Sequence, residues 1–215
     1  MEVLYSLDDE VVLAHRAEDA ETTNRFFETI ADEQGWVPPA GAIEAFPQNS
    51  FYFVHRTEDT LLGAVKMVMG NDDEGLPILK TWPELPLAGR TDVAELSIIA
   101  LAQGARGRGS SFLPLSVEVW KHCVRCGVVD LWAELEPRMV KAYNRFGWPF
   151  EVAGELREYW GDPLYPSRMN IEAAKVAFLD KAANQEKYRR VVEAAVGKAP
   201  YQSWLCGVSD GSTSS

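Results

Sequence analysis

The run VAELSIIAL, Val93 to Leu101, decides the fold, because it is a mostly apolar stretch typical of a buried strand and a glycine-rich turn follows it. The turn, Arg106-Gly-Arg-Gly-Ser-Ser111, leads into Phe112–Cys126, whose apolar spacing predicts a helix. A second apolar run, Val128–Glu134, and a second helix, Pro137–Phe146, come next. This order of strand, helix, strand and helix predicts two parallel neighbouring strands joined by a right-handed crossover.

The flanking segments extend this unit on both sides. Upstream we expect a strand at Val11–Arg16, a helix at Glu18–Ala31, a loop at Gly35–Gln48, and a hairpin of Ser50–His55 with Leu61–Met69. Downstream we expect strands at Phe150–Val152 and Arg168–Ile171, and one or two helices within Glu172–Val196. The last segment, Gly207–Ser215, has the low-complexity composition of a disordered tail.

Composition points to one globular domain. The chain has 215 residues, 47% of them hydrophobic, which is enough to bury a sizeable core. It has no run of about 18 uncharged apolar residues, and its acidic start lacks a signal segment, so we expect a cytoplasmic protein that does not enter a membrane. The formal charge of −11 disfavours nucleic acid as a partner, because binding phosphates needs a high density of cations.

One segment is locally positive within this acidic chain. Residues 101–150 hold seven basic and four acidic side chains, which fits either a solvated helix face or a site for an anion. The turn favours an anion site, because its glycines let backbone amides converge and the following helix adds its positive end. We expect it to bind a phosphate or pyrophosphate, with a plain strand-to-helix connection as the alternative. The residues concerned are Arg106, Gly107, Arg108, Gly109, Ser110 and Ser111.

The cysteines do not indicate a disulfide framework or a metal centre. Their number is odd, and Cys123-Val-Arg-Cys126 is a single CxxC pair without the further ligands that zinc needs. We therefore expect reduced, buried thiols and no metal.

Three motifs together resemble the GNAT superfamily of acyltransferases. Arg106-x-x-Gly109-x-Ser111 is similar to its [Q/R]-x-x-G-x-[G/A] turn, with Ser111 in the Gly/Ala place. Tyr143-Asn-Arg-Phe-Gly-Trp148 resembles its helix ending in Tyr-x-x-x-G-[FW], and His15-Arg-Ala-Glu-Asp-Ala20 resembles the entry to its first helix. The order and spacing agree across about residues 11–152.

The resemblance implies a mixed, mostly antiparallel sheet that splays between two central parallel strands, with helices on both faces and extra helices at the C-terminal end. It implies one domain over residues 1–206, with a core at about 11–152 and an extension at about 153–206. The donor would be an acyl thioester of coenzyme A or of the phosphopantetheine arm of acyl carrier protein. Its phosphate would lie on the turn, and its pantetheine along Ile99, Leu101 and Ala102.

A finer resemblance links the chain to acyl-homoserine-lactone synthases and long-chain N-acyl amino acid synthases. It covers Arg25-Phe-Phe27, Gly35-Trp36, the hairpin, Leu79–Leu85 and Ala94-Glu-Leu-Ser97. The synthases have Arg after E-x-S, where this chain has Ile98, and more acids after Gly-Trp, where this chain keeps Glu44. The departure counts against lactone formation and leaves N-acylation of another small amine open.

Direct attack of an amine on a thioester needs a base, an oxyanion donor and an acid for the leaving thiolate. Glu95 is the candidate base, because apolar neighbours on its strand would raise its pKa; a strand-end ion pair is the alternative. Tyr143 occupies the family's acid position near the thioester sulfur, with packing in the core as the alternative. A backbone amide near Leu101 or Ala102 would donate to the oxyanion if the strand carries a bulge there.

Acceptor and acyl pockets are harder to identify. Trp36, Phe46, Phe51 and Trp82 lie in segments that should line the acceptor side, or they are ordinary core aromatics. Glu44 and Glu84 are candidates for binding an acceptor ammonium, with surface acids as the alternative.

The leading prediction is therefore an N-acyltransferase for a small amine, with acyl carrier protein as a further partner and a homodimer as one role for the C-terminal helices. A lactone-forming synthase, a non-catalytic acyl-CoA-binding module and a protein- or nucleic-acid-modifying acetyltransferase are the alternatives.

Overall fold

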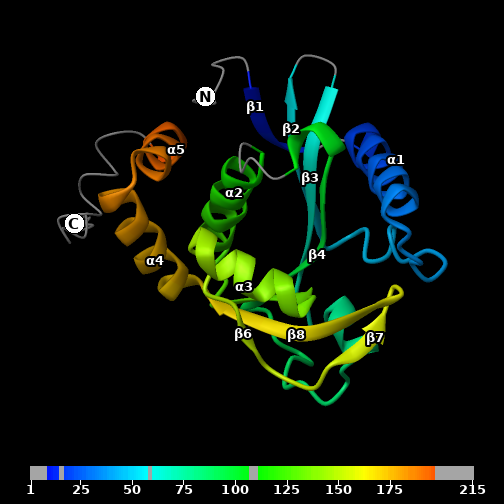
Figure 1. Ribbon diagram of the computed structural model, residues 1–215. Helices are drawn as coiled ribbons and strands as arrows, with labels where there is room; N and C mark the ends of the chain where they lie inside the picture. The colour runs from blue at the N-terminus through cyan, green and yellow to red at the C-terminus, as the bar shows by residue number, and fades with distance from the viewer. Residues whose placement is uncertain (1–8, 15–16, 58–59, 107–110, 197–215) are drawn as a thin grey trace, which may run out of the picture.

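The computed structural model describes residues 9–14, 17–57, 60–106 and 111–196 (Figure 1). Arg16, Gly107, Arg108, Gly109, Ser110 and the tail at 207–215, on which several predictions depend, lie outside these residues. No helix in the described part of the chain is both long enough and apolar enough to cross a membrane.

One twisted sheet forms the centre of the molecule (Figure 1). Its strands stand in the order β1-β2-β3-β4-β5-β8-β6, and β7 pairs with β8 outside this path. Their bounds are β1 Asp9–Ala14, β2 Ser50–Thr57, β3 Thr60–Met69, β4 Val93–Leu101, β5 Asp130–Leu135, β6 Glu151–Val152, β7 Arg157–Tyr159 and β8 Asp162–Asn170. Among the described strands only β4 and β5 are parallel, so the mixed, mostly antiparallel sheet predicted from the resemblance is confirmed.

Alternation along the strands divides the core between the two faces of the sheet. On β2 and β3, Phe53 and Val65 pack in the cluster that contains helix α2 (Phe112–Arg125). Their neighbours Val54 and Ala64 point the other way and pack against helix α1 (Ala17–Gln34). Because adjacent side chains of a strand lie on opposite faces, α1 and α2 cover opposite faces of the sheet, as Figure 1 shows.

Helix α3 spans Pro137–Phe146 and agrees with the range predicted from the sequence. Proline fits its first turn, because backbone N–H groups there have no hydrogen-bond partner within the helix and the N–H that proline lacks is not needed. Gly147 ends it with φ 94°, a left-handed conformation that glycine adopts without strain. Tyr143 points from this helix into the cluster around α2.

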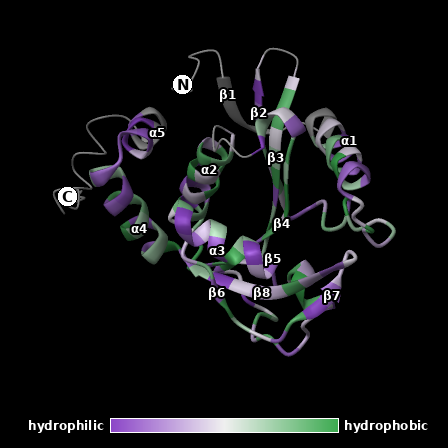
Figure 2. Cartoon of the chain, in the orientation of Figure 1, coloured by the Kyte–Doolittle hydropathy of each residue, from purple (hydrophilic) through white to green (hydrophobic). Residues whose placement is uncertain are grey.

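The chain beyond residue 152 completes the sheet and then leaves it. β8 begins at Asp162, several residues before the predicted Arg168, and pairs with β5 from Tyr165 to Asn170. Two helices follow, α4 (Ile171–Asn184) and α5 (Glu186–Val196), and both contact α2. In Figure 2 the sides of α2 and α4 that face each other carry hydrophobic residues among the polar ones. The extra C-terminal helices are therefore confirmed, and they extend the α2 layer.

Two short helical turns complete the fold. η1 (Pro77–Lys80) packs on β4 on the same face as α1, and η2 (Gln103–Ala105) follows β4. The thiols fit the reduced state predicted for them, because Cys123 and Cys126 are both free. Cys123 is buried, but Cys126 is exposed, since it lies just past the end of α2, so its predicted burial is wrong.

Candidate active site

The central feature of the site is a cavity of about 450 Å³ between β4 and β5. The two strands pair only from Val93 to Leu96 and from Asp130 to Ala133. Beyond these residues β4 continues to Leu101 and β5 to Leu135, but the two strands no longer pair with each other. They diverge, and side chains line the space between them. The cavity therefore begins where the parallel pairing ends.

The cavity opens toward both faces of the sheet. Leu96, Leu135 and Tyr143 line it from the α2 face, and Ile30 and Trp36 line it from the α1 face. Two reactants can therefore approach one point from opposite faces of the sheet.

A β-bulge on β4 lies beside the cavity. Lys66 of β3 pairs with Ile98, and Met67 pairs with Leu96, so Ser97 has no partner in the ladder. The bulge is at Ser97 and not near Leu101 or Ala102, so the condition set for an oxyanion donor at those residues is not met. The Ala102 amide donates to the Leu62 carbonyl at 3.0 Å. Ser97 lines the cavity and is the bulged residue that faces it.

Glu95 is completely buried on the α1 face of β4. Its Oε2 accepts a hydrogen bond from the Ile78 amide at 2.7 Å, and its Oε1 has no hydrogen-bond partner among the described residues. Burial is the main cause that raises its pKa well above the ordinary value, and the carboxylate of Glu134 adds to this effect. Glu95 does not line the cavity, but it lies next to a carboxyl that does.

That neighbour is Glu134 at the end of β5. Trp132 pairs with Glu95 in the parallel register, and Glu134 is two residues further on, so both carboxyls lie on the α1 face of the sheet. Glu134 lines the cavity, and its buried Oε1 has no hydrogen-bond partner among the described residues. Burial raises the pKa of Glu134 from 4.5 to about 8. The two carboxyls therefore form one coupled acid–base pair.

Aromatic side chains complete this half of the cavity. Trp36, Tyr159 and Trp160 all line it, and they come from the segment after α1 and from the β7–β8 turn. The ring centroids of Trp36 and Trp160 are 6.3 Å apart, and those of Tyr159 and Trp160 are 6.0 Å apart. The Val37 amide donates to the Trp160 carbonyl at 3.1 Å and ties the two segments together.

Tyr143 lines the other half of the cavity. Its ring is stacked on Phe112 at the start of α2, with centroids 5.2 Å apart and an interplanar angle of 6°. Burial raises the pKa of its phenol, so the hydroxyl stays protonated at neutral pH. Tyr143 is thus packed in the core, as the alternative interpretation expected, and it also lines the cavity; its role as the acid stays a prediction.

The predicted phosphate-binding turn is only partly described. Arg106 lines the cavity, donates to the Leu101 carbonyl at 2.8 Å and pairs with Glu33 at 3.0 Å. Ser111 is buried just before α2, and its Oγ has no hydrogen-bond partner among the described residues. Ile99 and Leu101 line the cavity, as expected for residues along the pantetheine.

The other residues predicted for the acceptor lie away from the cavity. Trp82 is fully buried in the cluster around η1, and its indole donates to the Glu155 carbonyl at 2.9 Å. Phe46 packs at the edge of that cluster, with the Lys80 ammonium 4.9 Å from its ring centroid. Glu44 is exposed. Glu84 is paired with Arg157 at 2.7 Å.

Phe51 also lies away from the cavity. It packs against the cluster around α2, and its ring centroid is 4.5 Å from that of His122. Of the residues predicted for the acceptor, the cavity therefore contains only Trp36.

Lys66 is a buried cation that the sequence analysis did not identify. It is fully buried on β3, and its Nζ donates to the Ile43 and Ala45 carbonyls at 2.5 and 2.6 Å. Burial lowers its pKa to about 8, against the attraction of Glu44 and Glu95. A single lysine within the apolar run LLGAVKMVM was the available signal.

Glu134, Tyr159 and Trp160 were also missed. Glu134 ends an apolar run, as Glu95 interrupts one, and the parallel arrangement of these runs was the available signal. Tyr159 and Trp160 lie in a segment for which no element was predicted, so the sequence offered no signal for them.

Known structures share this architecture. The chain resembles FeeM, an N-acyl amino acid synthase from uncultured soil microbes, at 15% identity and a TM-score of 0.63, over 79% of this chain and 94% of FeeM. It resembles the acyl-homoserine-lactone synthase LasI at 16% identity and a TM-score of 0.60, over 79% and 93% of the two chains.

A third similar structure is BjaI, a CoA-dependent acyl-homoserine lactone synthase solved with SAM and isopentyl-CoA. It shares 14% identity and a TM-score of 0.60, over 79% of this chain and 87% of BjaI. No protein-family profile and no curated protein matches the sequence. The structural likenesses establish the GNAT fold that the motifs predicted.

Proposed function

We propose that the protein is an N-acyltransferase that moves an acyl group from a thioester to the amine of a small molecule. The observation that carries this proposal is the cavity between the diverging ends of β4 and β5, with a coupled carboxyl pair on one side and a buried phenol on the other. The fold supports it, because the three similar structures are acyl-transferring synthases by their descriptions.

The reaction is a direct displacement at the thioester carbonyl. The amine nitrogen forms a bond to the carbonyl carbon, and the bond from that carbon to sulfur breaks. Starting from the ammonium, the nitrogen loses two protons: a carboxylate of the protein takes up one, and the other balances the proton that the departing thiolate gains. The products are an amide and a free thiol. No covalent intermediate with the protein is needed.

Glu134 receives the proton of the attacking ammonium, because it is the member of the carboxyl pair that lines the cavity. A base with a pKa of about 8 is well matched to an amine at neutral pH. Glu95, the base proposed from the sequence, acts through Glu134. When both carboxyls are ionised they repel each other, which keeps the affinity of the pair for a proton high.

Tyr143 returns a proton to the leaving sulfur from the opposite half of the cavity. Its raised pKa keeps the phenol protonated and able to donate. The backbone amide at the Ser97 bulge donates to the carbonyl oxygen as negative charge develops there.

The donor is coenzyme A or the phosphopantetheine arm of acyl carrier protein, with its phosphate at residues 106–111 and its chain along β4. Arg106 supports this placement, because it lines the cavity at the end of β4. The acyl chain extends between Leu135 and Met139, which line the α2 half of the cavity.

The test incubates the protein with acetyl-CoA, octanoyl-CoA or octanoyl carrier protein and a set of primary amines. A colorimetric thiol assay measures the release of free thiol, and mass spectrometry identifies the amide. We expect thiol release that depends on the amine, with one amide formed per thiol. If no donor is consumed faster in the presence of any amine, the proposed function is wrong.

Replacing Arg106 by Ala separates donor binding from chemistry. We expect the donor KM to rise about 10-fold, as for loss of one hydrogen bond to a charged group, while the acceptor KM stays unchanged. Arg145→Ala is the matched control, because Arg145 lies on α3 and does not line the cavity. A donor KM that Arg106→Ala leaves unchanged would contradict the phosphate site.

A further inference from the structure

The charged groups in the cavity wall are unequally compensated. Arg138 pairs with Glu136 at 2.7 Å and also lies in the field of Asp162, and Arg106 pairs with Glu33 at 3.0 Å. Both arginines of the described wall therefore have acidic partners, and Arg106 is also the residue proposed above for the donor's phosphate. Glu134 has no such partner among the described residues.

The buried cation behind the carboxyl pair cannot serve a ligand. Lys66 is completely buried, does not line the cavity, and already donates to the carbonyls of Ile43 and Ala45. Lys66 is attracted by Glu44 and Glu95, and Lys80 also attracts Glu95, whereas burial alone raises the pKa of Glu134. Glu134 therefore lacks a compensating positive charge when it is ionised.

The wall around Glu134 is otherwise aromatic. Trp36, Tyr159 and Trp160 line this half of the cavity, and Glu95 lies directly behind it. An ammonium next to a carboxylate among aromatic rings is a favourable arrangement, because the ring faces attract cations and the rings also cover an apolar body.

On the premise of the proposed acyltransfer, we propose that the acceptor is a primary amine with an apolar or aromatic body and no carboxylate, and that Glu134 binds its ammonium. An amino acid would place its carboxylate within a few ångströms of the ammonium, next to Glu134 and Glu95. No unpaired cation of the described wall would meet it there. Burying an uncompensated carboxylate is costly, so the wall selects against amino acids.

The bound ammonium also prepares the chemistry. It supplies the missing positive charge, so Glu134 and Glu95 can both be ionised before the reaction. One N–H proton then passes to the Glu134 carboxylate, and the neutral nitrogen attacks the thioester carbon. As the nitrogen–carbon bond forms and the carbon–sulfur bond breaks, the nitrogen releases its second proton to solvent, and the thiolate takes one from Tyr143, which regains a proton from solvent. The products are an amide and a thiol, with Glu134 protonated.

Matched pairs that differ only in a carboxylate test the proposal. Tyramine is compared with L-tyrosine, and tryptamine with L-tryptophan. Isothermal calorimetry measures binding to the full chain without any donor, and the thiol assay measures kcat/KM with octanoyl-CoA. We expect each amine to bind more tightly than its amino acid. We also expect its kcat/KM to be about 100-fold higher, because the amino acid would have to bury an unpaired carboxylate.

Glu134→Gln tests the residue itself. The neutral amide fills the same space, so we expect tyramine binding to weaken about 10-fold or more and the preference over tyrosine to shrink by the same factor. Glu158→Gln is the matched control, because Glu158 is exposed on the neighbouring strand β7 and does not line the cavity. A thermal melt of each variant confirms that it is folded.

The outcomes separate this inference from the proposed function. If tyrosine or tryptophan binds and reacts as well as its amine, the acceptor inference is overturned while acyltransfer stands. If Glu134→Gln keeps the full preference, the assignment to Glu134 is overturned. If the amines bind selectively but no donor is consumed, the binding site stands and the proposed transfer is wrong.

Discussion

The two ends of the β4–β5 pair are built in opposite ways. At the start of the strands polar groups are paired with one another, and the strands lie side by side. At the far end the strands separate, and Glu95 and Glu134 each keep one buried oxygen atom without a hydrogen bond among the described residues. We call these the closed end and the open end of the pair.

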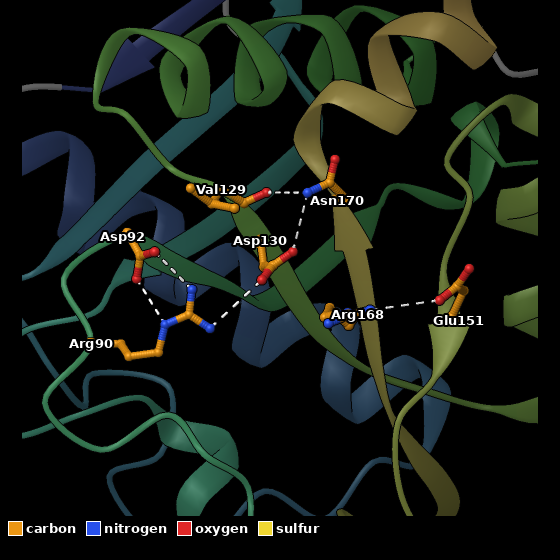
Figure 3. A network of polar contacts seen from close by, with 7 residues as sticks. All are labelled: Arg90, Asp92, Val129, Asp130, Glu151, Arg168 and Asn170. Carbon is orange, nitrogen blue, oxygen red and sulfur yellow. Dashed lines mark hydrogen bonds and ion pairs between the residues drawn. The ribbon is translucent and has the colours of Figure 1, made fainter.

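Figure 3 shows the network at the closed end. Arg90 donates to both oxygens of Asp92 at 2.8 Å and pairs with Asp130 at 3.6 Å. Asn170 donates to Asp130 at 3.4 Å and to the Val129 carbonyl at 3.3 Å. The pairing lowers the pKa of Asp92, so this end is stabilised while Asp92 is ionised.

The comparison shows that the destabilising charges lie at the open end. Glu134 and Glu95 are destabilising when charged, because burial removes their water and leaves one oxygen of each without a hydrogen bond among the described residues. Such costs are typical of sites that must exchange protons. The closed end holds the strands together, so that the open end can diverge.

The largest expected effect is on activity at the open end. We expect Glu134→Gln to lower kcat/KM about 100-fold or more, because the proton acceptor is lost. In the parent protein kcat/KM should rise with pH through about 8, where the Glu134 carboxyl loses its proton, and this limb should vanish in the variant. A pH–rate profile of both proteins checks this. An unchanged profile would assign the base elsewhere.

The second effect is on stability and has the opposite sign. The pKa of Glu134 is about 8 in the folded chain and 4.5 for an ordinary glutamate, as in the unfolded chain. Between these two pH values the folded chain therefore holds one more proton than the unfolded chain, and the free energy of unfolding falls as the pH rises. We expect Glu134→Gln to raise the free energy of unfolding at pH 8 by about 1–3 kcal/mol, with little change near pH 4.5. Urea unfolding at both pH values measures it, and the reverse trend would refute the burial of the charge.

A third effect tests the packing of the closed end. A β-carbon at Gly70 would overlap the Arg90 carbonyl and lie 2.8 Å from Cγ2 of Val93. We therefore expect Gly70→Ala to lower the free energy of unfolding by about 2 kcal/mol. Gly104→Ala is the control, because a β-carbon there meets no atom within 4 Å. Equal stability of both variants would show that the Gly70 contact can relax.

The smallest effect concerns the ion pairs of the closed end. Arg90→Gln removes the partner of Asp92 and Asp130 but leaves the open end intact. Since Arg90 and Asp92 are partly exposed, we expect a loss of unfolding free energy well below that of Gly70→Ala. The loss should be greatest where Asp92 is ionised and should decline as the pH falls and Asp92 is protonated. Activity per folded molecule should not change. A large fall in kcat would mean that the two ends are coupled.

Most of the sheet could be predicted from the sequence, because its strands are long apolar runs with clear interruptions. Strand β4 at Val93–Leu101 has the range that its pattern predicted, and so does helix α3 at Pro137–Phe146. The β7–β8 region was largely missed, since DPLYPS contains prolines and lacks regular alternation. Pairing with β5 stabilises this strand, and that pairing is a long-range contact that no local pattern reveals.

The site was predictable only in part, for the same reason. Tyr143, Arg106 and Trp36 were identified from motifs, and all three line the cavity. Trp82 and Phe46 belong to the same motif-bearing segments but lie in another cluster. A motif identifies residue types along the chain, but it does not say which side of a strand or turn faces the ligand.

The sequence by itself determined the order of the elements and the two parallel neighbouring strands, because local apolar patterns and the glycine-rich turn specify them. Only the tertiary structure decided that Glu134 lies near Glu95 and that Tyr159 and Trp160 line the same cavity as Glu134. The physical reason is that burial, charge repulsion and the pKa of a carboxyl depend on neighbours in space, and these come from segments far apart in the chain.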